Sequence, residues 1–323
     1  MSLLPDRYVI GVDLGGTKIH TALADGDGNI LAETRVPTET IKGPSHVIGR
    51  IIATIEQVRE QAGLPAGFVE TVSVGSPGPL DIASGIIHFS PNLGWHEVPL
   101  KKLLQEGLRT KVMIDNDANL AALGEHVFGA GRGVNNMVYI TVSTGVGGGL
   151  ILGGRLYHGA TDGAGEIGHI TVLPDGPPCG CGARGCLESV SSGTAIAREA
   201  RRLVECGKGQ NILTRAGGDP DRISAVTVAE AASGGDQEAV SIISNAARFL
   251  GIGVANVINL LNPDMIVLGG GVMEIGEPIW QGVRQEVEAR TLGAARTHVQ
   301  VVPAGLGRRA GVLGAVALAL QMD

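Results

Sequence analysis

One pattern of short apolar runs and glycine turns occurs twice in this chain, and it limits the possible folds more than any other feature. The first copy, YVIGVDLGGTKIHTALADGDGNILAETRV, starts at Tyr8, and the second, NMVYITVSTGVGGGLILGGRLYHG, starts at Asn136. Each copy indicates three strands joined by tight turns, which is typical of an antiparallel meander. A repeated supersecondary unit of this size is no short-period solenoid, and it predicts two related α/β domains.

The other elements follow from hydrophobic periodicity and turn residues. The strands of the first copy are expected over 8–14, 17–24 and 30–36, and further strands at SVGSPGPLD, KVMID, MIVLGGGV and HVQVVPA. Helices are expected over 44–62, 117–128, 191–206, 227–234, 237–261 and 308–321. We expect a smaller N-terminal α/β domain made of 1–117 plus 308–323, and a larger C-terminal α/β domain over 118–307.

Composition and charge exclude several classes of protein. The 323 residues are 44% hydrophobic, which is enough for a sizeable core, and the net charge of −7 comes without a long run of Lys or Arg. This balance argues against binding to nucleic acid or to an anionic membrane. The first residues lack the regions of a signal peptide, and no run of about 18 apolar residues is apparent. We therefore expect a cytoplasmic protein.

Two glycine turns are candidates for binding nucleotide phosphates, because glycine lets backbone N–H groups approach an anion closely. They are DLGGTK at 13–18 and STGVGGG at 143–149, and neither is a Walker A loop or a Rossmann fingerprint. The candidate phosphate contacts are Asp13, Gly15, Gly16, Thr17, Lys18, Thr144, Gly145, Val146, Gly147 and Gly148. Asp13 could hold Mg²⁺ through water. The alternative is that both are ordinary hairpin turns.

A third glycine cluster, GGGV at 269–272, follows a predicted strand. Its Gly270 could cradle the nucleoside, or the cluster could merely start a helix.

Carboxylates stand where the predicted strand KVMID meets a helix. Asp115, Asn116 and Asp117 are consecutive there. Asp117 suits the N-cap of the helix, where a carboxylate accepts from free backbone N–H groups. A carboxylate at this position could also act as a general base on a substrate hydroxyl. The residues alone leave Asp115 and Asp117 nearly equal as candidates for that base.

Three of the four cysteines, Cys179, Cys181 and Cys186, lie within eight residues, and His169 lies upstream of them. Three thiolates and one imidazole form a closed tetrahedral set for a structural Zn²⁺, one per chain. A disulfide would pair cysteines two at a time, and no C-x-x-C redox pair is present. His158 is a competing fourth ligand, and Cys206 is expected in the core.

Two glutamates, Glu166 and Glu188, flank this cluster. A zinc ion would fix the loop that carries both carboxylates. The alternative is that they are solvated surface charges.

The motifs DLGGTK, SPGPLD, PNLGW, DNDAN, STGVGGG, GEIGH and CGCGARGCLE occur in this order over 13–188. In this set and order the chain resembles the ROK family of sugar kinases and related repressors. The resemblance implies the actin-like (ribonuclease-H-like) ATPase fold, with two α/β domains that close on sugar and ATP. It implies that Asp117 is the general base, that Gly78 forms a wall of the sugar pocket, and that His169 binds zinc. The implied sugar contacts are Asn92, Asn116, Asp117, Glu166, His169 and Glu188.

The function expected from this resemblance is that of an ATP-dependent hexose kinase using Mg²⁺ with ATP, with glucose as the first choice of substrate. N-acetylmannosamine kinase and fructokinase are alternatives within the family, and polyphosphate could partly replace ATP. A sugar-responsive repressor would need a helix-turn-helix before the first strand, and a start near Tyr8 leaves no room for one. A sugar-binding protein without catalysis is a third possibility. The family resemblance implies a homodimer or a homotetramer.

Overall fold

The computed structural model describes residues 7–65 and 67–321, which form two compact units. One unit comprises the chain up to Tyr139, Gly149–Gly165 and the residues from Ala304 onward; the other comprises Ile140–Gly148 and Glu166–Pro303. The chain therefore passes between the units four times. The division predicted at 117/118 and 307/308 stays a prediction.

The first unit is built on a five-stranded sheet with the order β3-β2-β1-β4-β8. The strands are β1 (Tyr8–Leu14), β2 (Lys18–Asp25), β3 (Ile30–Pro37), β4 (Val69–Ser76) and β8 (Lys111–Asn116). β1, β2 and β3 are antiparallel, as predicted, whereas β4 and β8 run parallel to β1. Parallel strands end at one edge of a sheet, so the segments after Leu14, Ser76 and Asn116 leave the sheet at the same edge.

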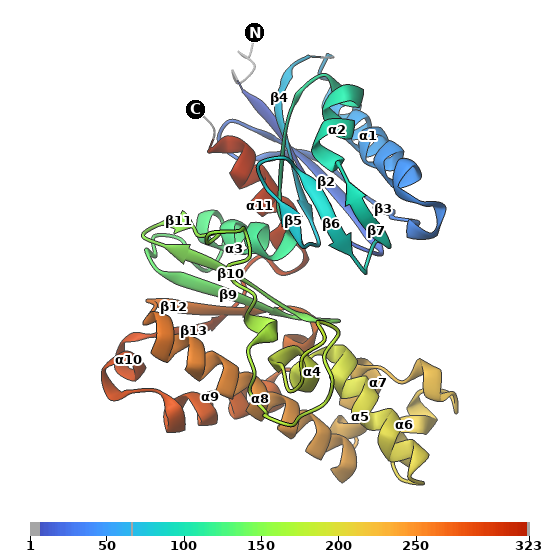
Figure 1. Ribbon diagram of the computed structural model, residues 1–323, viewed down its shortest axis with the longest axis vertical. Helices are drawn as coiled ribbons and strands as arrows, with labels where there is room; N and C mark the ends of the chain where they lie inside the picture. Colours follow the sequence, from blue (N-terminus) through green and yellow to red (C-terminus); the bar gives the residue numbers. More distant parts are fainter. Residues whose placement is uncertain (1–6, 66, 322–323) are drawn as a thin grey trace. The chain divides into compact units, whose positions relative to one another are not determined.

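Helices cover both faces of this sheet (Figure 1). α1 (Pro44–Gln61) and α2 (Leu100–Leu108) share one apolar core with Ile10, Val12 and Leu14 of β1. On the other face, α11 (Ala310–Leu320) packs against Val9 and Ala24, and α3 (Asp117–Val127) packs against α11. A Cβ on Gly11 would lie 2.6 Å from the carbonyl oxygen of Val312, which shows how closely α11 approaches β1.

Two parts of the first unit were not predicted. A three-stranded antiparallel sheet is formed by β5 (Leu80–Asp81), β6 (Ile86–Ser90) and β7 (Trp95–Val98), and α2 follows it directly. The strands are short, and their apolar residues are too few to produce a clear alternation, which is why this segment did not stand out in the sequence.

The second copy of the repeat forms another five-stranded sheet with the order β11-β10-β9-β12-β13. Its strands are β9 (Met137–Val142), β10 (Val146–Leu152), β11 (Arg155–Leu156), β12 (Met265–Gly269) and β13 (Gln300–Pro303), and β12 pairs with β13 in parallel. The boundary between the units runs through β9 and β10, because each strand contributes residues to both.

Helices form most of the second unit. They are α4 (Leu187–Ser191), α5 (Gly193–Glu205), α6 (Gln210–Arg215), α7 (Ala225–Ser233), α8 (Gln237–Leu261), α9 (Glu277–Arg290) and α10 (Gly293–His298). α8 has the predicted bounds: the Asp236 side chain caps its start, and Asn262 ends it in the left-handed conformation. The helix predicted over 191–206 instead begins after the cap residue Ser192, with α4 as a separate turn before it.

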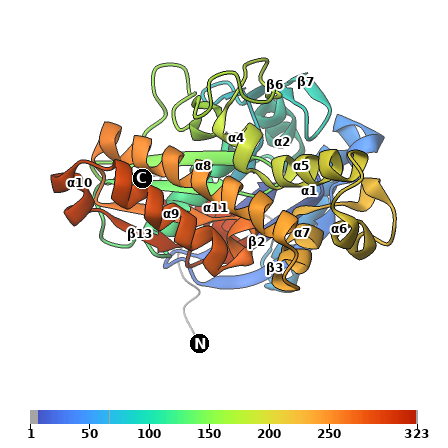
Figure 2. The ribbon, with the colours of Figure 1, turned by 90° about the horizontal axis from the view of Figure 1, so that it is seen from below.

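α8 and α9 lie side by side in both views (Figures 1 and 2). A Cβ on Gly282 of α9 would lie only 2.6 Å from the Cβ of Ala247, so glycine permits this close approach. One 18-residue window of α8 has a mean hydropathy of 1.4, so this helix is long and apolar enough to span a membrane by length and composition. This corrects the expectation that the chain contains no apolar segment of that length. Because 61% of that window is buried, α8 has the character of a core helix.

Short 3-10 helices complete the described chain: η1 (Thr40–Lys42), η2 (Ile167–His169), η3 (Pro220–Arg222), η4 (Gly271–Ile275) and η5 (Gly307–Arg309).

Candidate active site and metal centre

The first glycine turn joins β1 to β2 and is held by hydrogen bonds on both sides. The N–H of Gly15 donates to the carbonyl of Lys18 at 2.9 Å, and the hydroxyl of Thr38 donates to the carbonyl of Gly15 at 2.6 Å. The N–H of Thr38 donates to the carbonyl of Thr17 at 2.9 Å. Thr38 did not stand out in the sequence, because it lies more than twenty residues from the turn that it braces. Thr17 and Lys18 are exposed.

Two pairs of predicted site residues are in contact within the first unit. A Cβ on Gly16 would lie 2.6 Å from the carbonyl oxygen of Asn92, so the glycine turn lies directly against the PNLGW segment. A Cβ on Gly78 would lie 3.6 Å from the side-chain nitrogen of Asn116. The fold therefore brings a candidate phosphate turn and three candidate sugar-binding residues to one edge of the sheet.

Asn116, not Asp117, caps α3, which corrects the sequence-based expectation. The side-chain oxygen of Asn116 accepts from the N–H groups of Ala118 at 2.9 Å and Asn119 at 3.3 Å. Asp117 is the first helical residue, and its Oδ1 also accepts from the N–H of Ala118, at 2.8 Å. Since Asn116 supplies the cap, the half-buried carboxylate of Asp117 is not required for that role.

The choice between Asp115 and Asp117 as base, open from the residues alone, has a structural answer. Asp115 is only 1% exposed, and both its carboxylate oxygens accept hydrogen bonds from protein groups. A general base needs access to the proton that it removes. Asp115 lacks that access, so Asp117 is the better candidate.

Asp13, the second-last residue of strand β1, has a raised pKa. Burial and the negative charge of Asp117 raise the pKa of Asp13 to about 7, against the smaller opposite effect of Arg35. A Cβ on Gly311, near the start of α11, would lie 2.7 Å from the Asp13 carboxyl carbon. The negative charge of Asp117 thus acts on the Asp13 carboxyl, an arrangement that a bound cation would stabilise.

The second glycine turn, between β9 and β10, is contacted by side chains of its own unit. The N–H of Val146 donates to Oε2 of Glu188 at 2.9 Å, and a Cβ on Gly145 would lie 2.3 Å from the same oxygen. The hydroxyl of Thr194 donates to the carbonyl of Thr144 at 2.8 Å. The N–H of Val146 therefore already has a carboxylate partner, which the prediction of a phosphate contact at this residue did not include. Gly147 and Gly148 lie within β10.

Gly270 follows β12 with φ of 90°, and a Cβ there would lie 2.3 Å from the carbonyl oxygen of Val142 in β9. Both the positive φ and this close approach require glycine. A short 3-10 helix, η4, then begins at Gly271. Packing alone thus accounts for glycine at this position.

The four candidate zinc ligands are brought together within the second unit. One ligand atom from each of His169, Cys179, Cys181 and Cys186 lies within 4.8 Å of the others. The Sγ atoms of Cys181 and Cys186 are 3.7 Å apart, and Sγ of Cys179 lies 3.6 Å from Nδ1 of His169. Cys206, which we expected in the core, is exposed and lies outside this cluster.

The donor set fits a zinc ion. Burial, together with the neighbouring thiols of Cys179 and Cys181, raises the pKa of Cys186 to about 12, so ionisation of the Cys186 thiol is disfavoured without a cation. Zinc binds the thiolate form and removes this penalty. The two nitrogens of His169 face different partners: Nδ1 faces Cys179, and Nε2 lies 3.7 Å from Oε2 of Glu166.

Glu188 connects the cysteine cluster to the second glycine turn. It lies two residues after Cys186; its Oε1 lies 3.9 Å from Sγ of Cys179, and its Oε2 accepts from Val146. Glu188 is half-buried, so the alternative of a solvated surface charge does not hold for it. The side chain of Glu166 is exposed, at 60%.

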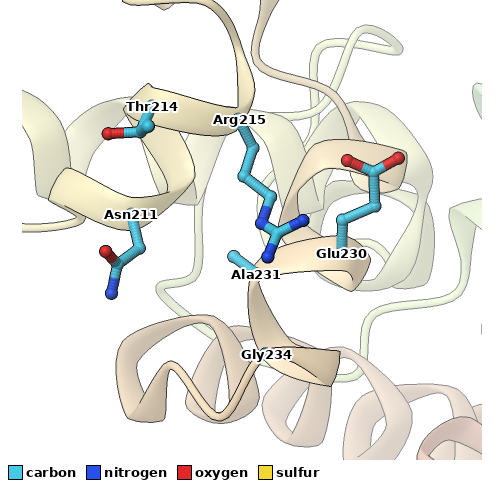
Figure 3. Close-up of a pocket in the computed structure, with 6 residues that line it drawn as sticks. All are labelled: Asn211, Thr214, Arg215, Glu230, Ala231 and Gly234. Atoms are coloured by element: carbon cyan, nitrogen blue, oxygen red, sulfur yellow. The ribbon is translucent and has the colours of Figure 1, made fainter.

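A pocket of about 480 Å³ elsewhere in the second unit contains none of the predicted site residues (Figure 3). It lies at α6 and α7, where Arg215 extends toward the C-terminal end of α7; a Cβ on Gly234 would lie 3.1 Å from the guanidinium. A cation at a helix C-terminus stabilises the helix dipole, which is a sufficient structural reason for Arg215.

Comparison with known proteins identifies related chains along the whole length. A family model described as "ROK family" matches residues 9–322. A glucokinase of Halalkalibacterium halodurans is 38% identical over 324 residues, covering 99% of this chain and 97% of that protein. A xylose repressor of Caldicellulosiruptor bescii is 31% identical over 314 residues, covering 97% of this chain and 78% of the repressor.

Among solved structures, a ROK family glucokinase from Streptomyces griseus in complex with glucose and AMPPNP superimposes with a TM-score of 0.83. It is 37% identical, and the match covers 98% of this chain and all of that chain. The expected actin-like ATPase fold is thereby confirmed.

Proposed function

The chain belongs to the ROK family, and on that premise we propose that it is an ATP-dependent glucokinase, which transfers the γ-phosphoryl group of ATP to the C6 hydroxyl of glucose. The glucokinases of Halalkalibacterium halodurans and Streptomyces griseus match it over nearly their full length, and the second was solved with glucose and AMPPNP. The repressor relative, in contrast, is matched over 78% of its length.

One observation within the chain carries the proposal. Asp13 of the first glycine turn and Asp117 at the start of α3 are close enough for the charge of Asp117 to raise the pKa of Asp13. This interaction, together with the pairing of Asp13 with Gly75, beside which Asp117 lies, supports a common site for the candidate phosphate turn and the candidate base. Asp117 would accept the proton of the sugar hydroxyl as the hydroxyl oxygen attacks the γ-phosphorus of ATP. The glycine turn would orient the phosphates, since phosphoryl transfer depends mainly on positioning and charge stabilisation.

Mg²⁺ would enter with ATP. When bound, it supplies positive charge that neutralises the phosphate oxygens. The raised pKa of Asp13 fits this role, because a carboxylate next to another carboxylate is stabilised by a cation. Asp13 would hold the ion through its hydration shell.

Zn²⁺ would be held by His169, Cys179, Cys181 and Cys186. Four protein ligands complete a tetrahedral site, so the metal has a structural role: it fixes the loop around Glu166 and Glu188. The segment has little regular secondary structure of its own. We propose that Glu166, Glu188 and Nε2 of His169 bind sugar hydroxyls in the second unit, and that Asn92 and Asn116 do so in the first, with Gly78 beside them.

The test is ADP release coupled to sugar phosphorylation. Purified protein with Mg·ATP is assayed separately with glucose, N-acetylmannosamine, fructose, mannose and allose, and with polyphosphate as donor. We expect glucose with ATP to give the highest kcat/KM. A higher value for N-acetylmannosamine or fructose would change the substrate within the family, and an inactive panel would contradict a kinase. We also propose a cytoplasmic location and a homodimer or homotetramer, which light scattering of the purified protein would test.

A further inference from the structure

Asp115 is a buried carboxylate to which the proposed mechanism gives no task. Its Oδ1 accepts from the backbone N–H of Asn116 at 2.7 Å and from the side-chain amide of Asn119 at 3.0 Å. Its Oδ2 is 2.8 Å from Nε2 of His158. Burying a carboxylate is costly unless it is paired and hydrogen-bonded, so His158 is the partner that balances this charge.

His158 lies 43 residues away in sequence, just after β11, with a side chain that is 30% exposed. It opens a loop whose ends are tied together by a bond from the N–H of Ala164 to the carbonyl of His158 at 2.9 Å. The same loop reaches the β5 segment, where Oδ2 of Asp162 accepts from the N–H of Ile82 at 3.0 Å. On the other side of His158, the N–H of Tyr157 donates to the carbonyl of Leu150 at 2.9 Å, so the backbone is held both before and after His158.

The residues that Asp115 holds are those next to the candidate base. Asn116 caps α3, Asp117 is its first residue, and Asn119 lies one turn further along the helix. A rotation of the Asp115 side chain would break its hydrogen bonds to both Asn116 and Asn119. The orientation of the Asp117 side chain depends on the position of these two residues.

We propose that His158 is a positioning residue for phosphoryl transfer: its hydrogen bond to Asp115 fixes the carboxylate that orients the Asn116–Asp117 backbone. The inference rests on the proposed function, and it assigns His158 a task other than zinc binding, since the clustered ligand set contains His169. Enzyme groups misplaced by about 1 Å can lose about a hundredfold in rate, so the effect should appear in kcat.

The charges around His158 determine how the pair responds to pH. The hydrogen bond that His158 donates to Asp115 raises the pKa of His158, burial lowers it by less, and the charges of Asp115 and Asp162 raise it further. The net shift is upward, so the ion pair stabilises the fold fully below the ordinary histidine pKa of about 6.5. This contribution is lost as pH rises through the raised pKa.

The experiment compares two substitutions at one position under steady-state conditions, with glucose and Mg·ATP. His158→Leu removes the donor, and we expect kcat to fall about 10- to 100-fold while the KM for ATP stays within about twofold. His158→Gln keeps an N–H donor without the charge, and it should recover a large part of kcat. The matched control is His298→Leu, because Nε2 of His298 bonds to Oδ1 of Asp264 at a similar 2.9 Å in an exposed pair of the second unit.

A second measurement keeps the test valid if His158→Leu does not fold. The ratio of wild-type kcat to His158→Gln kcat should be largest at low pH and should shrink toward one as pH rises, because only the wild type carries the imidazolium. A ratio independent of pH would overturn the inference.

A double-mutant cycle with Asp115→Asn separates positioning from general stability. If His158 acts through Asp115, the double variant Asp115→Asn/His158→Leu should lose little more kcat than Asp115→Asn alone. Additive losses, or an unchanged kcat in His158→Leu beside an active wild type, would overturn the inference alone. A wild type that phosphorylates no sugar would overturn the proposed function and this inference together.

Discussion

The acidic side chains of the two units are held in different ways. In the first unit, Asp115 and Asp117 stand where a strand becomes a helix, and backbone N–H groups, an amide and an imidazole fix them. In the second unit, Glu166 and Glu188 flank a turn-rich segment whose described residues form only one short 3-10 helix and isolated bridges before α4. A cluster of three thiols and one imidazole lies within that segment.

This difference teaches what positions the acidic side chains in each unit. Folding of the sheet alone places the carboxylates of the first unit. The zinc ion proposed for the cysteine cluster would order the glutamates of the second unit, because the segment between them has little regular secondary structure. Substitution of the candidate base in the first unit should therefore act on kcat, and substitutions at the metal centre should act on sugar binding.

The largest effect is expected from Asp117→Asn. It removes the proton acceptor but keeps the size of the side chain, so kcat should fall about 10²- to 10⁴-fold. The KM for glucose, the zinc content and the melting temperature should change little. Steady-state kinetics and thermal denaturation measure these quantities, with Asp27→Asn, at an exposed turn of the same unit, as the control. Turnover within tenfold of the wild type would remove Asp117 as the base.

Cys181→Ser should have the next largest effect, on the KM for glucose rather than on kcat. Losing one of four ligands should reduce zinc from about one per chain to a small fraction and raise the KM for glucose at least about tenfold. Metal analysis and kinetics check this, and Cys206→Ser is the matched control, because Cys206 is exposed and outside the cluster. If the wild type contains no zinc near one per chain, the assignment of the metal centre is wrong.

A single methyl group in the first glycine turn should have an intermediate effect. A Cβ on Gly16 would lie 2.6 Å from the carbonyl oxygen of Asn92, so Gly16→Ala must displace one of the two segments. We expect kcat/KM to fall about tenfold for both ATP and glucose. The control, Gly49→Ala in α1, meets nothing within 4 Å and should raise the melting temperature slightly without changing kinetics. Normal kinetics in Gly16→Ala would mean that the turn tolerates displacement.

The elements that the sequence predicts well are those with a strong period or a clear stop signal. Both meanders and α8 are confirmed, since their apolar residues alternate or recur every three to four positions. α9 was not predicted, although its buried Ile279, Val283 and Val287 recur every four residues. That signal was available, but polar residues between them obscured it.

Partners distant in sequence could not be predicted. The cysteine cluster is local, so spacing indicated its three thiol ligands, and the family resemblance favoured His169 over His158 as the fourth. The bonds from His158 to Asp115 and from Val146 to Glu188 join residues more than forty positions apart, and they exist only because the sheets bring strand ends together. The N-cap was assigned to Asp117 because Asn and Asp suit that position equally, and only the backbone geometry selects Asn116.

The smallest expected effect is the pH dependence of stability that Asp13 causes. It tests whether the carboxylates of Asp13 and Asp117 share one site. Asp13 has a pKa of about 7, raised by burial and by Asp117, so the native state keeps a proton that the unfolded chain loses near pH 4. Stability should therefore fall as pH rises from about 4 to about 7, and Asp13→Asn should remove that fall. Because Mg²⁺ needs the ionised carboxylate, the wild-type KM for Mg·ATP should decrease as pH rises through 7.

Asp25 provides a control of opposite sign for this last prediction. Burial raises the pKa of Asp25, but the hydrogen bonds from Asn29 and from nearby backbone N–H groups outweigh burial and lower it. The stabilisation from Asp25 is therefore present above pH 4 and is lost as pH falls below that value. Thermal denaturation of Asp13→Asn and Asp25→Asn across pH 3 to 9 separates the two. If Asp117→Asn leaves the pH dependence at Asp13 unchanged, the two carboxylates do not interact and the first unit holds them independently.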